Sequence, residues 1–472
     1  MEILLLFIYC LLLLISSSYW WFKIQRNGWN IENIFLLFII LYYLFIPVNI
    51  IIFGGEIYDS SIKSYMVPAS RFVSFSSFFI TLLFIGIFIF GLAVRGSSYK
   101  LVKIYIIRVN GANLYRAVSY FLALLSFLSL LIYIQQWGGI SSFLTNLNLS
   151  RAGRFDEDAV GKYVSFGRFI DLSVLPIVYF LYEKRKNRRD WIVLLFIPLI
   201  VFVFNILFLS TSKTRLIGLV LFFYFTVSIY KNKLYLQRLL LISIGVFWGV
   251  PILDDMFIFI YRVFTREGIL AVPLRIVFAI LDGSLGSGQY EVFLKDNPHS
   301  PYFQFLEYFT YVQMSLQFSL DNSYPLLFFR DFLTGIAKFI PSRLNIQTGI
   351  EVQQLNTALF YNYYPEIPAL NWGVPPGIIS FGMYSLSVPG VIVIAFILGY
   401  IFRGVDLFFK SLVEIDRRFS PFYAYVIVVL GIYSTIGIPK EAIYDFGFLV
   451  FLVTFFFMSF KFEPVQSEKP VD

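Results

Sequence analysis

The side chains best suited to chemistry in this sequence are cations held in short polar segments between apolar runs. The segment STSKTR, residues 210–215, carries Lys213 and Arg215 and connects two such runs. Because apolar helices on both sides would fix this turn at a membrane surface, it could offer backbone N–H groups and two positive charges to a phosphate. The alternative is that both long side chains extend into the lipid headgroups.

Two arginines in the segment YRVFTREG have a spacing that places side chains on one helical face. Arg262 and Arg266 are four residues apart, so their guanidinium groups would point in the same direction. Such a pair can bind one anion through forked hydrogen bonds. The nearby Glu267, Asp254 and Asp255 leave open the alternative of structural ion pairs.

A second arginine pair and a single arginine complete the candidate anion-binding set. Arg151 and Arg154 precede the acidic run 156–158, which could pair with them within the loop, and Arg343 lies in the segment GIAKFIPSRLN. The stretch 254–385 contains seven Lys and Arg against eleven Asp and Glu, so it is not a general polybasic surface. Arginines directed at one anion explain this pattern better, and a lipid-linked diphosphate fits as that anion.

His299 is the default candidate for acid–base chemistry. It is the one histidine of the chain, and its ordinary pKa is the closest of all side chains to neutrality. Pro298 and Pro301 on either side predict a stiff turn rather than a helix. The carboxylates of Asp296, Glu307 and Glu291 are alternative bases, and a structural role for a solitary histidine stays open. The run GSLGSG, residues 283–288, is typical of a linker, because it lacks the strand, lysine and helix of a phosphate-binding loop.

The composition shows what kind of protein must position these residues. Of 472 residues, 58% are hydrophobic, 20% aromatic and only 14% charged, and the mean hydropathy is +0.77. These values exclude a water-soluble protein. With one cysteine, Cys10, and one histidine, neither a disulfide framework nor a Cys/His metal site is expected. The net charge of +8 arises in short loops between apolar runs, which favours membrane topology over nucleic-acid binding.

The apolar runs predict an all-α, polytopic transmembrane bundle of about eleven spans. Most runs are long enough, at 1.5 Å per residue, to cross a hydrocarbon core roughly 30 Å thick. The first run lacks a basic segment and a cleavage pattern, so we interpret it as a retained span. The predicted spans are 2–22, 34–53, 72–94, 117–136, 165–182, 191–210, 216–230, 239–253, 386–402, 422–438 and 446–460.

The basic residues predict which loops face the cytoplasm. One alternating set of loops, with the C-terminal tail, holds 21 Lys and Arg, whereas the short loops of the opposite set hold nine. The first set is therefore predicted to be cytoplasmic and the N-terminus external. The chain then divides into spans 1–253, a long external loop 254–385, spans 386–460 and a cytoplasmic tail 461–472. Aromatic and aliphatic residues at 256–280 and 302–320 predict helices within that loop, in the interface or between spans. The tail itself has the composition of a disordered segment.

Proline and glycine predict a break where the chain returns to the membrane after the long loop. In the stretch 371–406, Pro376 and Gly377 should start a short helix, while Pro389 and Gly390 should open the span itself. The small residues there would permit close approach of a neighbouring helix.

In these features the chain resembles the bacterial oligosaccharide repeat-unit polymerases, the O-antigen polymerase or Wzy group. The resemblance rests on the STSKTR turn, the YRVFTREG segment, the long loop with GIAKFIPSRLN, and the return GVPPGIISFGMYSLSVPGVIVIAFILGYI. It covers roughly residues 210–406, and the predicted topology matches over the rest. His299 in PHSPY is also similar to a histidine of the related O-antigen ligases, although Ser300 stands where an asparagine would be expected.

The resemblance implies a GT-C-like fold and a glycosyltransferase at the outer face of the bacterial inner membrane. A growing glycan would move from undecaprenyl diphosphate to the non-reducing end of a fresh lipid-linked repeat unit, without metal or cofactor. Membrane lipids and a chain-length regulator would be its other partners. The diphosphate would be bound by Arg215, Arg262 and Arg266, and secondarily by Lys213, Arg151, Arg154 and Arg343. His299 or a loop carboxylate could serve as the general base, and Tyr361, Tyr363 and Tyr364 could stack on sugars or anchor the chain in the interface.

Three other functions compete with this interpretation: a transporter, a ligase, and a regulatory partner without catalysis. A polysaccharide flippase or transporter would favour charged residues along a path through the spans, whereas most predicted spans here are free of charge. An O-antigen ligase would share the donor chemistry but would deliver the glycan to lipid A core.

Overall fold

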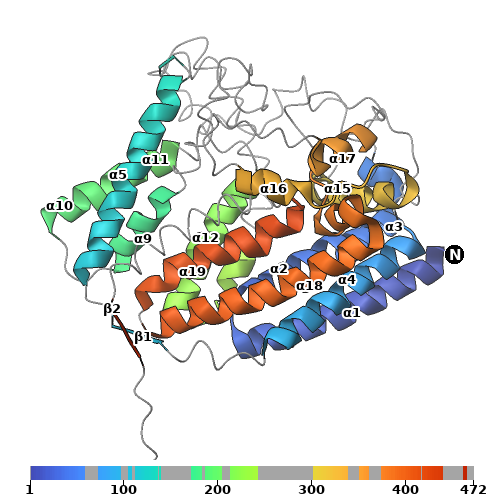
Figure 1. The fold of residues 1–472 in the computed structure, drawn as a ribbon, viewed down its shortest axis with the longest axis horizontal. Coiled ribbons are helices and arrows are strands. Elements are labelled where there is room, and N and C mark those ends of the chain that lie inside the picture. The colour runs from blue at the N-terminus through green and yellow to red at the C-terminus, as the bar shows by residue number, and fades with distance from the viewer. Residues whose placement is uncertain are drawn as a thin grey trace, which may run out of the picture.

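The structure is a bundle of helices with one short two-stranded ladder (Figure 1). The computed structural model describes residues 2–58, 73–96, 105–108, 112–136, 138–139, 172–182, 187–204, 213–235, 237–242, 301–337, 350–360, 374–415, 417–438 and 461–464. Its elements are α1 (Glu2–Asn27), α2 (Ile31–Ile40), η1 (Leu41–Phe45), α3 (Ile46–Tyr58), α4 (Phe75–Gly96), β1 (Tyr105–Arg108), α5 (Ala112–Gln136), α9 (Val174–Tyr182), α10 (Arg188–Asp190), η5 (Trp191–Phe196), α11 (Ile197–Phe204), α12 (Lys213–Lys231), α15 (Pro301–Asp321), α16 (Arg330–Ala337), α17 (Val352–Phe360), α18 (Ile378–Ile415), η8 (Arg417–Phe419), α19 (Ser420–Val426), η9 (Ile427–Ile432), η10 (Tyr433–Ile436) and β2 (Lys461–Pro464).

Five helices of the described residues are long and apolar enough to cross a membrane: Ile3–Asn27, Ile31–Ile52, Phe75–Val94, Arg116–Gln135 and Ile378–Glu414. A helical protein with several membrane spans is thus supported, while the prediction of about eleven spans goes beyond these five. Two shorter apolar helices, Val220–Lys231 and Ser420–Ile436, coincide with further predicted spans. The predicted spans 165–182, 191–210 and 239–253 fall only partly in the described residues, and 446–460 lies outside them.

Two of the helices are widened immediately before a proline. The π-helical turns η1 and η5 precede Pro47 and Pro198, respectively. A proline in a helix has no N–H to donate, and its ring collides with the carbonyl group four residues earlier. A wider turn at that point accommodates the ring, so α2, η1 and α3 continue as one path through the bundle.

The closest helix pair of the core is α4 with the long second part of α18, which lie side by side in Figure 1. Glycines make this approach possible: a methyl group on Gly399 would overlap the backbone oxygen of Phe88, and one on Gly91 would lie 2.6 Å from that of Phe396. The neighbouring α2 fills the remaining side with Phe35, whose ring centroid lies 5.1 Å from that of Phe402. Small residues at a crossing allow this tight backbone contact between membrane helices.

Helix α18 is broken where the prolines and glycines predict it. Leu386 and Ser387 have non-helical backbone angles, so a short helix beginning at Ile378 is followed, from residue 388, by the long one. Gly377, with a φ of +76°, precedes the short helix and donates its N–H to the Ile436 carbonyl oxygen at 2.8 Å. The long helix runs beyond the predicted span end at 402, to Ile415.

The ladder is a feature that the sequence patterns did not predict. Strands β1 and β2 pair antiparallel, with Ile106 opposite Glu463. Since hydrogen-bonded strands cannot lie on opposite sides of a 30 Å core, the loop between α4 and α5 and the start of the C-terminal tail share one side of the bundle. The charge count likewise predicts that these two segments lie on the same side of the membrane. The first four residues of the tail form a strand, whereas the composition of the tail predicts disorder.

The two ends of the bundle differ in chemistry. One end, here named the basic end, carries Lys23, Arg403, Lys410 and Arg417. At the other end, named the α15 end, α15 packs against the first turn of α4, where the Ser74 hydroxyl donates to Gln317 Oε1 at 2.8 Å. Helix α15 matches the helix predicted for residues 302–320, and it is tucked against α3, α4 and α18 rather than exposed.

Candidate functional site at the α15 end

Most of the predicted site residues lie outside the described residues. These are His299, Arg151, Arg154, Arg262, Arg266 and Arg343. The exceptions are Lys213 and Arg215, whose backbone forms the first turn of α12. The structure therefore does not bring the predicted anion-binding set together, and that part of the site stays a prediction.

The first turn of α12 lies at the α15 end. The opposite end of this helix is fixed by Arg417, which donates to the Tyr230 carbonyl oxygen at 3.4 Å, and by Trp29, whose ring centroid is 5.2 Å from that of Phe225. Both contacts belong to the basic end. Nineteen residues of helix span roughly 28 Å, so the backbone of Lys213 lies about that far from the last turn of α12.

A buried hydrogen-bond network joins α15, α17 and the short helix of α18. Asn356 is at its centre: its amide nitrogen donates to the Ser315 hydroxyl and to the Val374 carbonyl, each at 3.0 Å, and its oxygen accepts from the Tyr384 hydroxyl at 2.9 Å. The Thr357 hydroxyl accepts the Val374 N–H at 2.8 Å. These bonds hold residue 374 against the last turns of α17, so the two ends of the tyrosine-rich segment 361–373 are tied together.

A buried carboxylate joins α16 to α17. Asp331, 1% exposed in the first turn of α16, accepts the N–H of Val352 at 3.1 Å through Oδ1. This bond satisfies a backbone donor at the start of α17 that no helical carbonyl could reach. The bond therefore holds the start of α17 against the first turn of α16.

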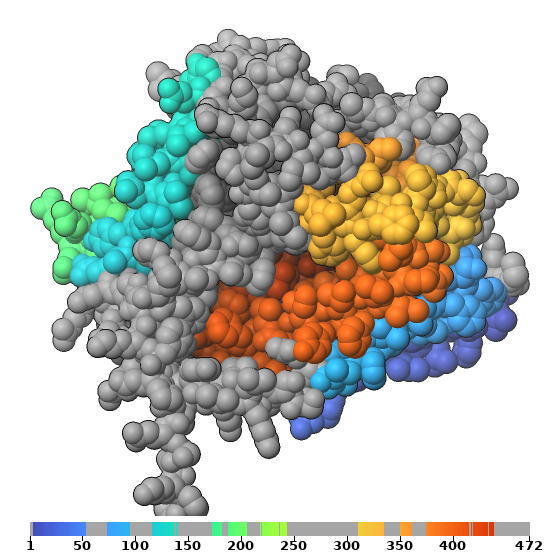
Figure 2. Space-filling model, in the orientation of Figure 1, coloured from blue at the N-terminus to red at the C-terminus, as the bar shows by residue number. Residues whose placement is uncertain are grey.

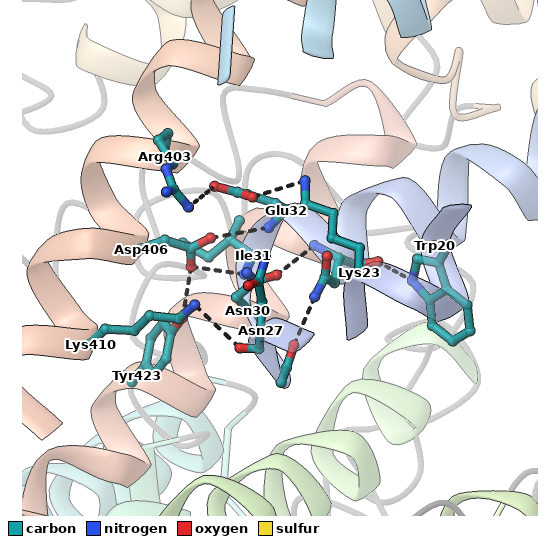
Figure 3. Close-up of polar contacts among 12 residues, drawn as sticks. Trp20, Lys23, Asn27, Asn30, Ile31, Glu32, Arg403, Asp406, Lys410 and Tyr423 are labelled. Carbon is teal, nitrogen blue, oxygen red and sulfur yellow. Dashed lines mark hydrogen bonds and ion pairs between the residues drawn. The ribbon is translucent and has the colours of Figure 1, made fainter. Parts of the chain in front are cut away.

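The basic end holds the densest polar network of the described residues (Figure 3). Asp406 of α18 is fully buried and accepts the backbone N–H groups of Ile31 and Glu32, at 2.9 and 3.3 Å, and the Tyr423 hydroxyl at 2.8 Å. The free N–H groups at a helix start favour a carboxylate, because they add to the positive end of the helix dipole. Asp406 thus caps α2 from another helix and ties α2, α18 and α19 together.

Glu32 is the second buried carboxylate of this network. Its two oxygens pair with Lys23 Nζ at 3.0 Å and with Arg403 Nη1 at 3.1 Å, from α1 and α18. Each oxygen of the two carboxylates therefore has at least one protein donor, and the network acts as a structural clamp of the basic end. Sequence reasoning missed it because Asp406 and α2 are far apart in the chain, and the one local signal was Asn30, the side-chain cap of α2.

A third carboxylate connects α5 to α10. Asp190 accepts from Arg116 Nε at 2.9 Å, from the Tyr120 hydroxyl at 2.6 Å and from the Asn187 N–H at 2.9 Å. Burial acts to raise the pKa of Asp190, but these hydrogen bonds outweigh it and hold the pKa below its ordinary value.

This shift predicts how stability depends on pH. A carboxyl whose pKa is depressed by folding stabilises the fold above its unfolded pKa, about 3.9, and the stabilisation is lost as the pH falls through the folded pKa. Asp190→Asn should therefore lower the unfolding temperature in detergent at pH 7. The difference in unfolding temperature between the variant and the wild type should decrease steadily below pH 4. A gap of equal size at pH 7 and pH 3 would contradict this account of Asp190.

Comparison with known proteins identifies no relative: no family model, no curated protein and no solved structure matches the chain.

Proposed function

We propose that the protein is a glycosyltransferase that joins undecaprenyl-diphosphate-linked oligosaccharide repeat units into a surface polysaccharide at the outer face of the bacterial inner membrane. The observation that carries the proposal is the position of Lys213 and Arg215 in the first turn of α12, whose last turn lies at the basic end. The charge distribution assigns the basic end to the cytoplasm. The backbone that carries both residues then lies towards the leaflet that would hold the phosphates of an outer-leaflet lipid.

The chemistry of this reaction matches the types of residue predicted for the site. The bond between the anomeric carbon of the donor glycan and the diphosphate oxygen breaks, and the electron pair leaves with the diphosphate. Arg215, with Arg262 and Arg266 from the long loop, would stabilise the charge that develops there. The acceptor hydroxyl forms the new bond to the anomeric carbon and loses its proton to a base, for which His299 is our candidate.

The frame at the α15 end supports this assignment further. Asp331 joins α16 to α17, and Asn356 joins α17 to Val374, so these described residues flank the segments that carry Arg343 and the tyrosines 361, 363 and 364. Loops held at both ends by a rigid frame are the usual carriers of binding residues. The proposal thus places the donor, the acceptor sugar and the cations at one end of the bundle.

The competing transporter function has one observation in its favour, because Glu32 and Asp406 are charged residues within candidate spans. Both, however, are engaged by side chains and backbone groups of the protein at the basic end. The enzyme therefore explains the distribution of polar groups better.

Deletion of the gene followed by gel profiling of the glycans tests the proposal. A polymerase predicts loss of the ladder with single repeat units remaining, and a plasmid carrying Arg215→Ala should fail to restore long chains. A ladder that persists on the lipid carrier would indicate a ligase instead, and a build-up facing the cytoplasm would indicate a flippase. Restoration of full chain length by Arg215→Ala would contradict the role of this arginine.

A further inference from the structure

A strained turn precedes α16 at the α15 end. The described residues include four non-glycine residues with positive φ, and three of them are Phe328, Phe329 and Ser387, at 48°, 55° and 57°. The two segments involved are bonded together: the Leu327 and Phe328 N–H groups donate to the carbonyl oxygens of Tyr384 and Ser385 at 3.0 and 2.9 Å. Strained backbone of this kind persists only where the surroundings hold it, and it gathers at functional sites.

The strained turn presents an arginine to the surface. Arg330 is the first residue of α16, its side chain is exposed, and its guanidinium group has no ion pair among the described residues. Asp331 and Thr334 are buried on the opposite face of the helix. Since residues three apart share a helical face, Arg330 and Leu333 project together.

Exposed apolar side chains surround this cation. Phe328 is 68%, Leu333 63% and Leu326 40% exposed, whereas Phe329 and Phe332 turn inward onto Phe381. We name Leu326, Phe328, Arg330 and Leu333 the amphiphilic patch. In Figure 2 the gold surface of α15 and α16 lies above α18, which is orange. One free guanidinium group beside three apolar side chains matches a ligand with an anionic head and a hydrocarbon chain.

We propose that the amphiphilic patch binds a polyprenyl diphosphate, with Arg330 on the diphosphate and Leu326, Phe328 and Leu333 against the first isoprene units. The proposal rests on the proposed function and adds a lipid-binding residue to it. A forked guanidinium group suits phosphate oxygens, and the patch lies at the same end of the bundle as Lys213 and Arg215. The strained turn fixes Phe328 and Arg330 before the ligand arrives, which reduces the ordering cost of binding.

Binding to the purified full-length chain in detergent tests the patch, with farnesyl diphosphate as the probe. Loss of a hydrogen-bonded charged pair weakens binding roughly tenfold or more, so Arg330→Gln should raise the Kd for farnesyl diphosphate by at least about that factor. Phe328→Ser should raise it several-fold by removing chain contacts. Lys231→Gln, an exposed cation at the basic end, is the matched control and should leave the Kd unchanged.

Three results would overturn the proposal. The first is an equal Kd for the wild type and Arg330→Gln. The second is competition by a short-chain phosphatidylglycerol at the same concentration as farnesyl diphosphate, which would assign the patch to ordinary phospholipid headgroups. The third concerns folding: should Arg330→Gln unfold, Arg330→Lys keeps the charge without the fork, and wild-type affinity in that variant would contradict forked binding.

The binding measurement and the glycan profile of the deletion strain together separate this proposal from the proposed function. If the glycan ladder survives gene deletion while farnesyl diphosphate binding depends on Arg330, the polymerase function fails and the lipid site stands. If deletion abolishes the ladder but Arg330→Gln binds farnesyl diphosphate normally, the lipid site fails and the polymerase function stands.

Discussion

Replacing Asp406 by alanine should lower the free energy of unfolding by about 3–5 kcal/mol, the largest effect expected of any single polar substitution in the described residues. The substitution removes the acceptor for two backbone N–H groups of α2 and for the Tyr423 hydroxyl, and all of them stay buried. Hydrogen bonds to a charged group are each worth about 1.5–3 kcal/mol, and their loss leaves donors without water or protein partners. Thermal unfolding of the purified protein in detergent measures the effect.

Glu414→Gln is the matched control for Asp406→Ala. It removes a carboxylate from the same helix, but at an exposed position, where a substitution usually changes stability by less than about 0.5 kcal/mol. Asp406→Asn should fall between the two, because its one carbonyl oxygen can replace only part of the carboxylate. An unfolding temperature for Asp406→Ala equal to that of Glu414→Gln would show that the clamp contributes nothing to stability.

The second large effect is expected at the crossing of α4 and α18. Gly399→Val should cost about 3 kcal/mol or more, since the new side chain would collide with the backbone oxygen of Phe88 rather than with a movable side chain. The helices would have to separate along their length, which would also disturb the packing of Phe35 against Phe402. The yield of monodisperse protein and its unfolding temperature report both consequences.

The control for Gly399→Val lies on the same helix pair. A methyl group on Gly86 of α4 would meet nothing within 4 Å, so Gly86→Ala should be neutral or stabilise the helix by up to about 1 kcal/mol. Equal losses of stability for Gly399→Val and Gly86→Ala would contradict this explanation. They would mean that the close approach of the α4 and α18 backbones does not decide which side chains these positions accept.

The features that sequence reasoning predicts are those determined by local physics. Long apolar runs become helices because a membrane leaves the backbone no other way to satisfy its hydrogen bonds. The break in α18 follows from the positions of Pro389 and Gly377, since proline cannot continue the hydrogen bonds of a preceding helix. The packing of α15 follows from its aromatic and aliphatic composition, although not its buried polar contacts.

The features that sequence reasoning misses depend on partners far apart in the chain. Nothing local to Asp406 indicates that it caps α2, and nothing in the segment 461–464 indicates β1 as its partner. The same limit applies to Arg330, because the strained turn that carries it is bonded to Tyr384 and Ser385, far away in the chain. The convergence of Arg262, Arg266 and His299 stays a prediction for the same reason, because those residues lie outside the described part of the chain.

The most direct test of the polymerase function is reconstitution of the purified protein in vesicles with the lipid-linked repeat units that the deletion strain accumulates. The account predicts a ladder of glycans on the lipid carrier, with one equivalent of undecaprenyl diphosphate released for each bond formed and no ladder with Arg215→Ala. Movement of intact lipid-linked units across the vesicle membrane, without chain growth, would contradict it.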